Sequence, residues 1–231
     1  MTIIRNKSAL PLAPLLAPSL VMAAALLLSA CAQQAVSPEA TAAAKVDNPA
    51  PTVSLLEFDK MTPEDRVGLT VHFARVGDLA GLKRLLDAGA DVNGRDELDQ
   101  TPLIAAVSQD SLAGVTELLR RGASVASVDK AGWTPLHFAT FFSTDTRVMQ
   151  ALLDAGANVN ARNDRGITAL YFAAATGHED QVKLLLSRGA DQSIASNSGW
   201  TPLRVTRTKG IESITRLLDP NGKAAAPVSG S

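Results

Sequence analysis

The chain has 231 residues and a formal net charge of −1, with 46% hydrophobic and 19% charged residues. This length exceeds the roughly 100–150 residues of a typical single domain, but parts of the chain lack the large apolar residues of a packed core, so we expect one folded domain. Without Arg5 and Lys7, the charged residues of positions 1–30, the net charge becomes −3. A chain without a basic excess is poorly suited to bind phosphates, so we expect no nucleic-acid partner.

Residues 1–30 have the pattern of a signal peptide. Arg5 and Lys7 precede an apolar run that ends at Ala30, as a basic n-region precedes an h-region. A permanent transmembrane helix is the alternative, and it would need about 20 apolar residues. Three prolines interrupt the run and leave residues 20–30 as the stretch free of proline and charge. An export signal therefore explains the segment better than a membrane span.

The single cysteine of the chain, Cys31, directly follows this segment, so no disulfide can form within the chain. The sequence Leu28-Ser29-Ala30-Cys31 resembles the lipobox of bacterial lipoproteins. This resemblance implies cleavage before Cys31 and a lipid anchor on its thiol, and several acyl chains would hold the protein stably at a bilayer. Ala32, rather than Asp, follows the cysteine, which in such lipoproteins indicates the outer membrane facing the periplasm. A buried structural cysteine and an ordinary secretory signal cleaved nearby remain open.

Two segments are rich in small residues and proline and poor in large apolar residues. Such compositions do not offset the entropy of ordering a chain. We expect residues 31–60, which begin with the lipidated cysteine, to form a flexible tether, and residues 220–231 to form a disordered tail. The 21 residues from Ala32 to Thr52 would span about 25 Å root-mean-square.

Between these segments, two sequence markers recur with one period. Gly-Ala pairs begin 33, 34 and 33 residues apart, at Gly89, Gly122, Gly156 and Gly189. Thr-Pro-Leu or Thr-Ala-Leu triplets begin at the same spacings, at Thr101, Thr134, Thr168 and Thr201. Two independent markers with a shared period indicate a tandem structural repeat.

These residues resemble the ankyrin repeat, whose pattern is Gly-x-Thr-Pro-Leu-His-x-Ala, then a Leu-Leu pair, then Gly-Ala-x-x-Asn. Residues 129–160 contain the clearest copy. The resemblance implies an all-α ankyrin-repeat solenoid of stacked helix-turn-helix units with short hairpin loops. It covers residues 61–219 in about five repeats: 63–95, 96–128, 129–162, 163–195 and 196–219.

Residue chemistry supports the same helices. Threonine caps helix N-termini, and a proline directly after it occupies a position where its missing N–H donor costs nothing. Val115, Leu118 and Leu119 have the i, i+3, i+4 spacing of an amphipathic second helix. The glycine of each Gly-Ala pair suits the left-handed residue that ends such a helix. We expect four first-helix leucines to be buried: Leu103, Leu136, Leu170 and Leu203.

The terminal repeats and repeat three depart from the pattern. Repeat one lacks Thr-Pro-Leu, and the first helix of repeat five carries polar residues that suit a stack end facing water. We expect these residues to be solvated: Arg204, Thr206, Arg207 and Lys209. Repeat three has one extra residue, which alignment places near Phe142 to Asp145, in the turn between its helices.

The sequence shows no catalytic constellation. It contains three histidines and one cysteine, and the cysteine is assigned to lipid, so a Cys/His nucleophile or a zinc cluster of the usual spacing is not available. No Gly-rich phosphate loop occurs. By the resemblance, His137 and His178 satisfy neighbouring polar groups within the fold. We expect a non-enzymatic protein without a metal, a cofactor or a small-molecule substrate.

In the ankyrin family, the loop tips and the concave face of the first helices contact partners. Trp133 and Trp200 occupy the same loop position in repeats three and five, and such aromatic residues are enriched in binding hot spots; packing on the adjacent loop is the alternative. Phe141 and Phe142 end the first helix of repeat three, where they either face the partner groove or are buried by the reshaped turn. The candidate contact residues are Leu98, Gln100, Lys130, Trp133, Phe141, Phe142, Arg165, Ile167 and Trp200.

Together these features predict a membrane-anchored interaction module that binds an exported periplasmic protein and stabilises or scaffolds it. An inhibitor that protects the cell from a toxin acting in the envelope would have the same sequence features and remains open.

Overall fold

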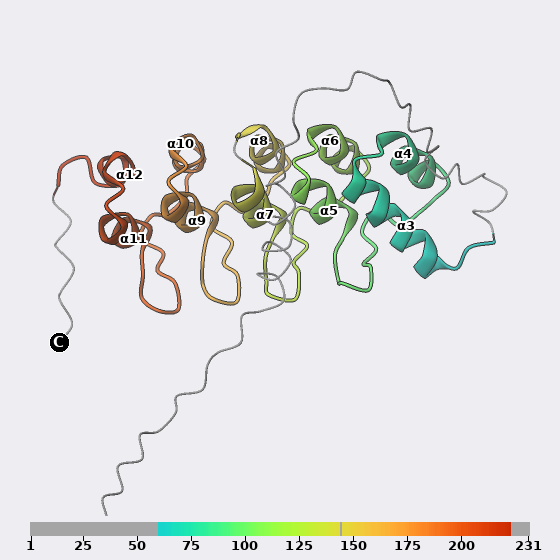
Figure 1. Cartoon of the computed structure of the whole chain (residues 1–231), viewed down its shortest axis with the longest axis horizontal. Coiled ribbons are helices and arrows are strands. Elements are labelled where there is room, and N and C mark those ends of the chain that lie inside the picture. The colour runs from blue at the N-terminus through green and yellow to red at the C-terminus, as the bar shows by residue number, and fades with distance from the viewer. Residues whose placement is uncertain (1–59, 144, 223–231) are drawn as a thin grey trace, which may run out of the picture. The chain divides into compact units, whose positions relative to one another are not determined.

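The computed structural model describes residues 60–143 and 145–222, and these ranges form ten α-helices and no β-strand (Figure 1). The helices are α3 (Pro63–Val76), α4 (Leu79–Asp87), α5 (Pro102–Ser108), α6 (Leu112–Arg120), α7 (Pro135–Phe142), α8 (Arg147–Asp154), α9 (Ala169–Thr176), α10 (Glu179–Ser187), α11 (Pro202–Lys209) and α12 (Glu212–Leu218). The predicted signal peptide, Cys31, the predicted tether up to residue 59 and residues 223–231 of the predicted tail lie outside the described residues. None of the ten helices has the length and apolar character needed to cross a membrane.

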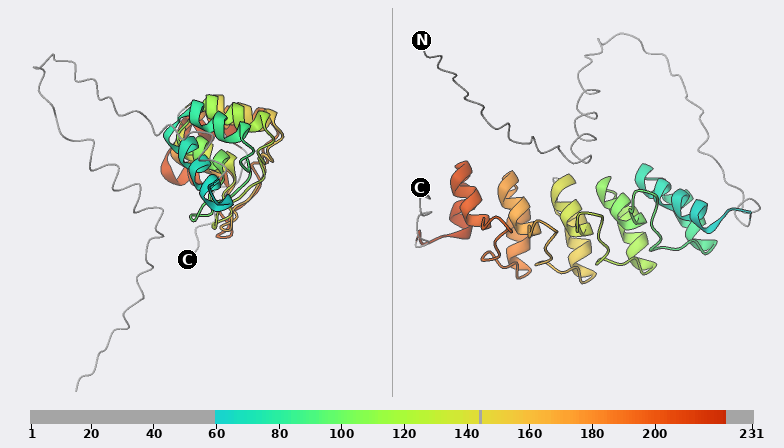
Figure 2. Two further views of the ribbon diagram at one scale, coloured as in Figure 1. Left: turned by 90° about the vertical axis from the view of Figure 1, so that its right-hand side faces the viewer. Right: turned by 90° about the horizontal axis from the view of Figure 1, so that it is seen from below.

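The helices form five pairs that stack side by side. Helices α3, α5, α7, α9 and α11 make one row, and each packs on the next; the even-numbered helices make a second row (Figures 1 and 2). The hairpin loops between successive pairs project on the side of the first row (Figure 1). This arrangement confirms the predicted all-α solenoid of helix-turn-helix units.

Threonine side chains set the start of the first helices. From α5 to α11, each first helix follows a threonine whose hydroxyl accepts a hydrogen bond from the backbone N–H three residues later: Thr101, Thr134, Thr168 and Thr201. Helix α3 starts earlier than its counterparts, because Thr62 and Asp65 form a capping box ahead of 14 helical residues, whereas α5 has 7. The first repeat therefore begins with a longer helix at the end of the stack.

Left-handed glycines end the second helices, as the Gly-Ala period predicts. Gly122 has a φ of 87°, its N–H donates to the carbonyl of Leu119, and the N–H of Ala123 donates to the carbonyl of Leu118 at 2.9 Å. Gly89, Gly156 and Gly189 adopt the same conformation. A residue with a Cβ is strained at such φ values, which explains why the period is marked by glycine.

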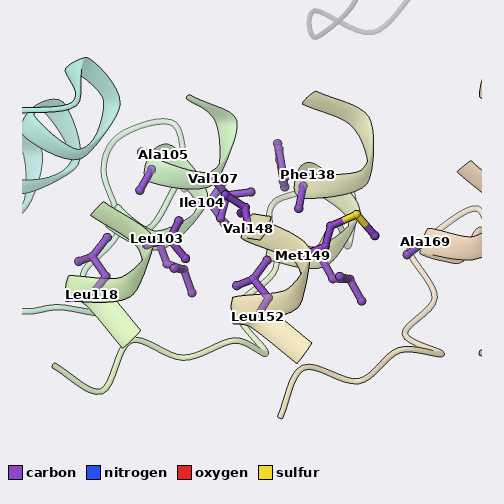
Figure 3. Packing of buried hydrophobic residues seen from close by; sticks show 14 of the residues in the cluster. Leu103, Ile104, Ala105, Val107, Leu118, Phe138, Val148, Met149, Leu152 and Ala169 are labelled. Atoms are coloured by element: carbon purple, nitrogen blue, oxygen red, sulfur yellow. The ribbon is translucent and has the colours of Figure 1, made fainter. Parts of the chain in front are cut away.

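The core is a continuous layer of apolar side chains between the two rows of helices (Figure 3). Leu118, Met149 and Leu152 from the second helices each have 0% exposure, and Leu103 of α5, which is 1% exposed, belongs to the same cluster. Three of the four predicted first-helix leucines are buried, whereas Leu203 is half-buried, because α11 is the last first helix of the described stack. Each pair thus depends on its neighbours to bury its apolar face.

Repeat five also corrects the prediction for Thr206. Its side chain is not solvated but fully buried, because the position faces α12; its hydroxyl donates to the carbonyl of Leu203 at 2.9 Å and accepts from Thr215 Oγ1. Arg207 is half-buried and pairs with Asp219 at 2.6 Å. The other two polar residues of this helix, Arg204 and Lys209, are exposed as predicted.

Candidate protein-binding face

Aromatic rings from α7, α9 and the loop before α7 form one continuous cluster. The ring of Trp133 lies 4.7 Å from that of Phe172 and 5.6 Å from that of Phe141, measured between centroids. These separations lie in the range of favourable aromatic pairs. We call the whole set the aromatic patch: Trp133, Phe138, Phe141, Phe142, Tyr171 and Phe172.

The outer rings of the aromatic patch are open to solvent. Phe141 is 43% exposed and Phe142 is 45% exposed, whereas Phe138 beneath them is 6% exposed. The structure therefore excludes the alternative in which the reshaped turn buries both phenylalanines. Trp133 and Phe172 are half-buried, so Trp133 packs within the cluster and still presents part of its ring.

The extra residue of repeat three lies beside these rings. Helix α7 ends at Phe142 and α8 begins at Arg147, so four residues connect them, where two connect α9 and α10. Buried Ser143 fixes the start of this turn: its hydroxyl donates to the Asp110 carboxylate, and its carbonyl accepts from Gln181 Nε2 at 2.7 Å. These bonds tie the turn to repeats two and four.

A groove of about 500 Å³ opens between the hairpin loops of repeats four and five. Its apolar lining comes from Ile167, Tyr171, Trp200 and Val205, and its polar lining is Asp164, Arg165, Ser196, Asn197 and Ser198. Tyr171 lines the groove and its ring lies 6.5 Å from that of Phe172, so the groove and the aromatic patch share Tyr171. We call the groove and the aromatic patch together the loop-side face.

Side-chain turns and bonds between loops hold the loop-side face in place. Asp129 Oδ1 accepts from the backbone N–H groups of Ala131 and Trp133 at 2.9 and 2.8 Å. Between repeats four and five, Asn197 donates its backbone N–H to the carbonyl of Arg165 at 2.9 Å. The tips are therefore ordered by hydrogen bonds and present their side chains from a rigid edge.

Comparison with known proteins agrees with this geometry. A family model described as ankyrin repeats (three copies) matches residues 71–163 and 141–225. The chain belongs to the ankyrin-repeat family.

The chain is also similar to part of several notch proteins. Neurogenic locus notch homolog protein 1 of Mus musculus is 36% identical over 141 residues, which are 60% of this chain and 6% of that protein. Neurogenic locus notch homolog protein 2 of Homo sapiens is 36% identical over 136 residues, 58% of this chain and 6% of that protein. The matched region thus spans about 6% of these relatives' length. Ankyrin repeats are protein-protein interaction modules that are generally non-enzymatic.

The ankyrin fold places the predicted contact residues at two locations. Leu98 and Gln100 lie in the loop of repeat two, apart from the loop-side face; Leu98 is 64% exposed, and Gln100 accepts a hydrogen bond from Arg75 Nη2 at 3.0 Å. The others lie on or beside the loop-side face: Lys130, Trp133, Phe141, Phe142, Arg165, Ile167 and Trp200.

Sequence reasoning missed Tyr171, Phe172 and Arg204 as members of this face. The sequence did contain a signal for Tyr171, because this residue occupies the position that His137 holds in the preceding repeat. Arg204 is exposed as predicted, and its guanidinium carbon also lies 4.5 Å from the centroid of the Trp200 ring, a cation-π distance that the sequence did not indicate.

His137 has the structural role that the family pattern predicts. Its Nδ1 accepts from the backbone N–H of Thr134 at 3.1 Å, and its Nε2–H donates to the carbonyl of Ile167 at 2.9 Å; these partners imply the neutral tautomer. Burial lowers the pKa of His137 below its ordinary value of 6.5. The imidazole therefore links the repeat-three helix to the repeat-four loop as a neutral group.

The largest charge cluster lies away from the loop-side face, on α6. Glu117 accepts hydrogen bonds from Arg120 at 2.7 Å and from Arg121 at 2.9 Å, and these bonds lower the pKa of Glu117 from 4.5 to about 2. Arg121 also pairs with Asp87 of α4. The cluster joins the second helices of repeats one and two. Among the described residues, no group of three or more His, Cys, Asp or Glu side chains is arranged to hold a metal ion.

Proposed function

We propose that the loop-side face binds an exported protein and that the chain presents this face in the periplasm from a lipid anchor on Cys31. The observation that supports the binding role is the solvent-exposed pair Phe141 and Phe142 beside Trp133. The sequence Leu28 to Cys31 supports the anchor, and Ala32 after the cysteine supports the outer membrane. In this role the protein holds or stabilises its partner near the membrane surface and performs no chemistry.

The energy available from the exposed rings fits a binding hot spot. Phenylalanine buries about 200 Å² when fully covered, so Phe141 and Phe142, at 43% and 45% exposure, leave roughly 180 Å² for a partner. At about 25 cal/mol per Å² this area corresponds to about 4 kcal/mol before the costs of association. A contact of this size at the centre of an interface decides whether a complex forms.

Affinity purification of the full chain from membranes tests the proposed binding role. We expect the variant Phe141→Glu/Phe142→Glu to lose the captured protein, because a partner would have to bury two carboxylates against the remaining rings. Its melting temperature should stay close to that of the parent chain, because both positions are exposed. The matched control is Val76→Glu, which places a carboxylate at another residue that is 59% exposed, at the far end of the stack. If the Phe141/Phe142 variant captures the partner as well as the parent chain does, the proposed binding site is wrong.

A separate experiment tests the anchor. Metabolic labelling with a palmitate analogue should label the parent chain and leave Cys31→Ser unlabelled. Label that persists in this variant contradicts the lipidation site. The binding proposal would survive that result, because the aromatic patch does not depend on the anchor.

A further inference from the structure

The loop-side face carries or borders cationic side chains that form no ion pair within the fold. The structure has ten ion pairs within residues 60–143 and 145–222. None of them includes Lys130, Arg165 or Arg204. Arg165 lines the groove, and Arg204 lies over the ring of Trp200, which also lines it. Guanidinium groups in such positions are available to carboxylates of a partner.

The helices of this face contribute no opposing charge. Neither α7 nor α9 contains Asp, Glu, Lys or Arg. Lys209 at the end of α11 adds a further cation, which donates to the carbonyl of Ala175 at 2.7 Å. The carboxylate of Asp164 lines the groove and opposes these cations. The carboxylate of Asp129 accepts hydrogen bonds from two backbone N–H groups of its own loop. The face is therefore locally basic on a chain whose net charge is −1.

Ring contacts connect the groove to the exposed part of the aromatic patch. The groove floor contains Val205, which is 5% exposed, with the half-buried rings of Tyr171 and Trp200. The ring of Tyr171 contacts that of Phe172, and the centroid of the Phe172 ring lies 6.2 Å from that of the exposed Phe141 ring. In the described part of the chain the Tyr171 hydroxyl makes no protein hydrogen bond, so it is free to donate to a ligand.

We propose that the occupant of this face is an acidic segment of the partner protein, with carboxylates that pair with Arg165 and Arg204. Apolar side chains of the same segment enter the groove between Tyr171 and Trp200 and cover Phe141. This inference rests on the proposed function and names the chemistry of the partner. Opposite charge across a partly desolvated interface provides specificity and speeds association, so binding also weakens as the salt concentration rises.

Peptide selection with a charge swap tests this proposal. A phage-displayed library of random 12-residue peptides is selected on the purified full chain, on Arg165→Glu/Arg204→Glu, and on the control Lys83→Glu/Arg216→Glu. The control makes the same change in net charge at exposed positions of α4 and α12. We expect the parent chain and the control to select peptides enriched in Asp and Glu beside apolar residues. The charge-swap variant should select Lys and Arg instead, a reversal that a purely structural role would not produce.

Affinity measurements complete the test. A synthetic peptide from the parent selection should bind Arg165→Glu/Arg204→Glu at least about tenfold more weakly, while the control binds it as the parent does. Equal affinity for the variant, peptides without acidic enrichment, or no selected peptide at all each overturn the proposal. If sedimentation velocity shows a dimer that the charge swap dissociates, the occupant is a second copy and the proposal is also overturned. Membrane capture that still depends on Phe141 and Phe142 would keep the proposed function while this inference fails.

Discussion

Gly166 is the residue at which the stacking of adjacent loops is most directly testable. It has a φ of 71°, and a Cβ at this position would lie 2.9 Å from the backbone N of Asn197 and close to the side chains of Arg162 and Asn197. Gly199 of the next repeat has a similar φ of 76° but meets no atom within 4 Å. The variants Gly166→Ala and Gly199→Ala therefore share the backbone strain and differ in the contact between loops.

The structure sets the expected magnitudes. A left-handed alanine costs about 1–2 kcal/mol, and the loss of unfolded-state entropy offsets about 0.4–1 kcal/mol, so we expect Gly199→Ala to destabilise the fold by about 1 kcal/mol. Gly166→Ala adds an overpacked contact with backbone, typically about 1–3 kcal/mol. It also disturbs the hydrogen bond from Asn197 to Arg165. The total for Gly166→Ala is about 2–4 kcal/mol.

Urea unfolding measures both free energies. Helix content from circular dichroism and the fluorescence of Trp133 and Trp200 should report coincident transitions, which justifies a single free energy for a repeat stack. A Gly166→Ala variant that is no less stable than Gly199→Ala would refute the argument, because the contact with Asn197 would then have no energetic effect. The same result would remove the reason for a rigid groove between these loops.

Three further predictions follow from buried groups. The free energy of unfolding should fall as pH drops below 6.5, because folding lowers the pKa of His137 and the unfolded chain then binds protons more readily. In urea titrations, His137→Gln should reduce this dependence of the unfolding free energy on pH. Stability should fall again from pH 4.5 towards pH 2 as Glu117 is protonated, and Glu117→Gln should be less stable at pH 7 but lose less on acidification, followed by circular dichroism. Leu152→Ala should cost about 2–5 kcal/mol in urea unfolding, because its side chain is fully buried.

The predictions for Glu117 and Leu152 each have a control on the same helix type. For His137, a parent slope below pH 6.5 that survives His137→Gln would contradict the assignment. Glu212→Gln should leave the acid transition unchanged, since its pair with Arg216 is about 80% exposed on both sides. Leu153→Ala, at a half-buried neighbour of Leu152, should cost less, and equal losses would argue against the packing in Figure 3.

Much of the fold was predictable because its signals are local. The threonine caps and the left-handed glycines act through hydrogen bonds to residues three to five positions away, so they appear in the sequence at the ends of the helices they set. Each repeat packs on its neighbours, which makes the period of about 33 residues sufficient to predict a solenoid. The aromatic candidates Trp133, Phe141 and Phe142 came from the same alignment of repeats.

The surroundings of those candidates were decided by the tertiary structure. The sequence left open whether Phe141 and Phe142 are buried; in the structure both are exposed, beside a turn that Ser143 ties to two other repeats. Thr206 was expected to be solvated, but its position faces α12. A face formed by side chains from three repeats depends on how the repeats stack and how each turn is closed. The sequence therefore determined the helices and their order, while packing between repeats determined which aromatic and basic groups share one surface.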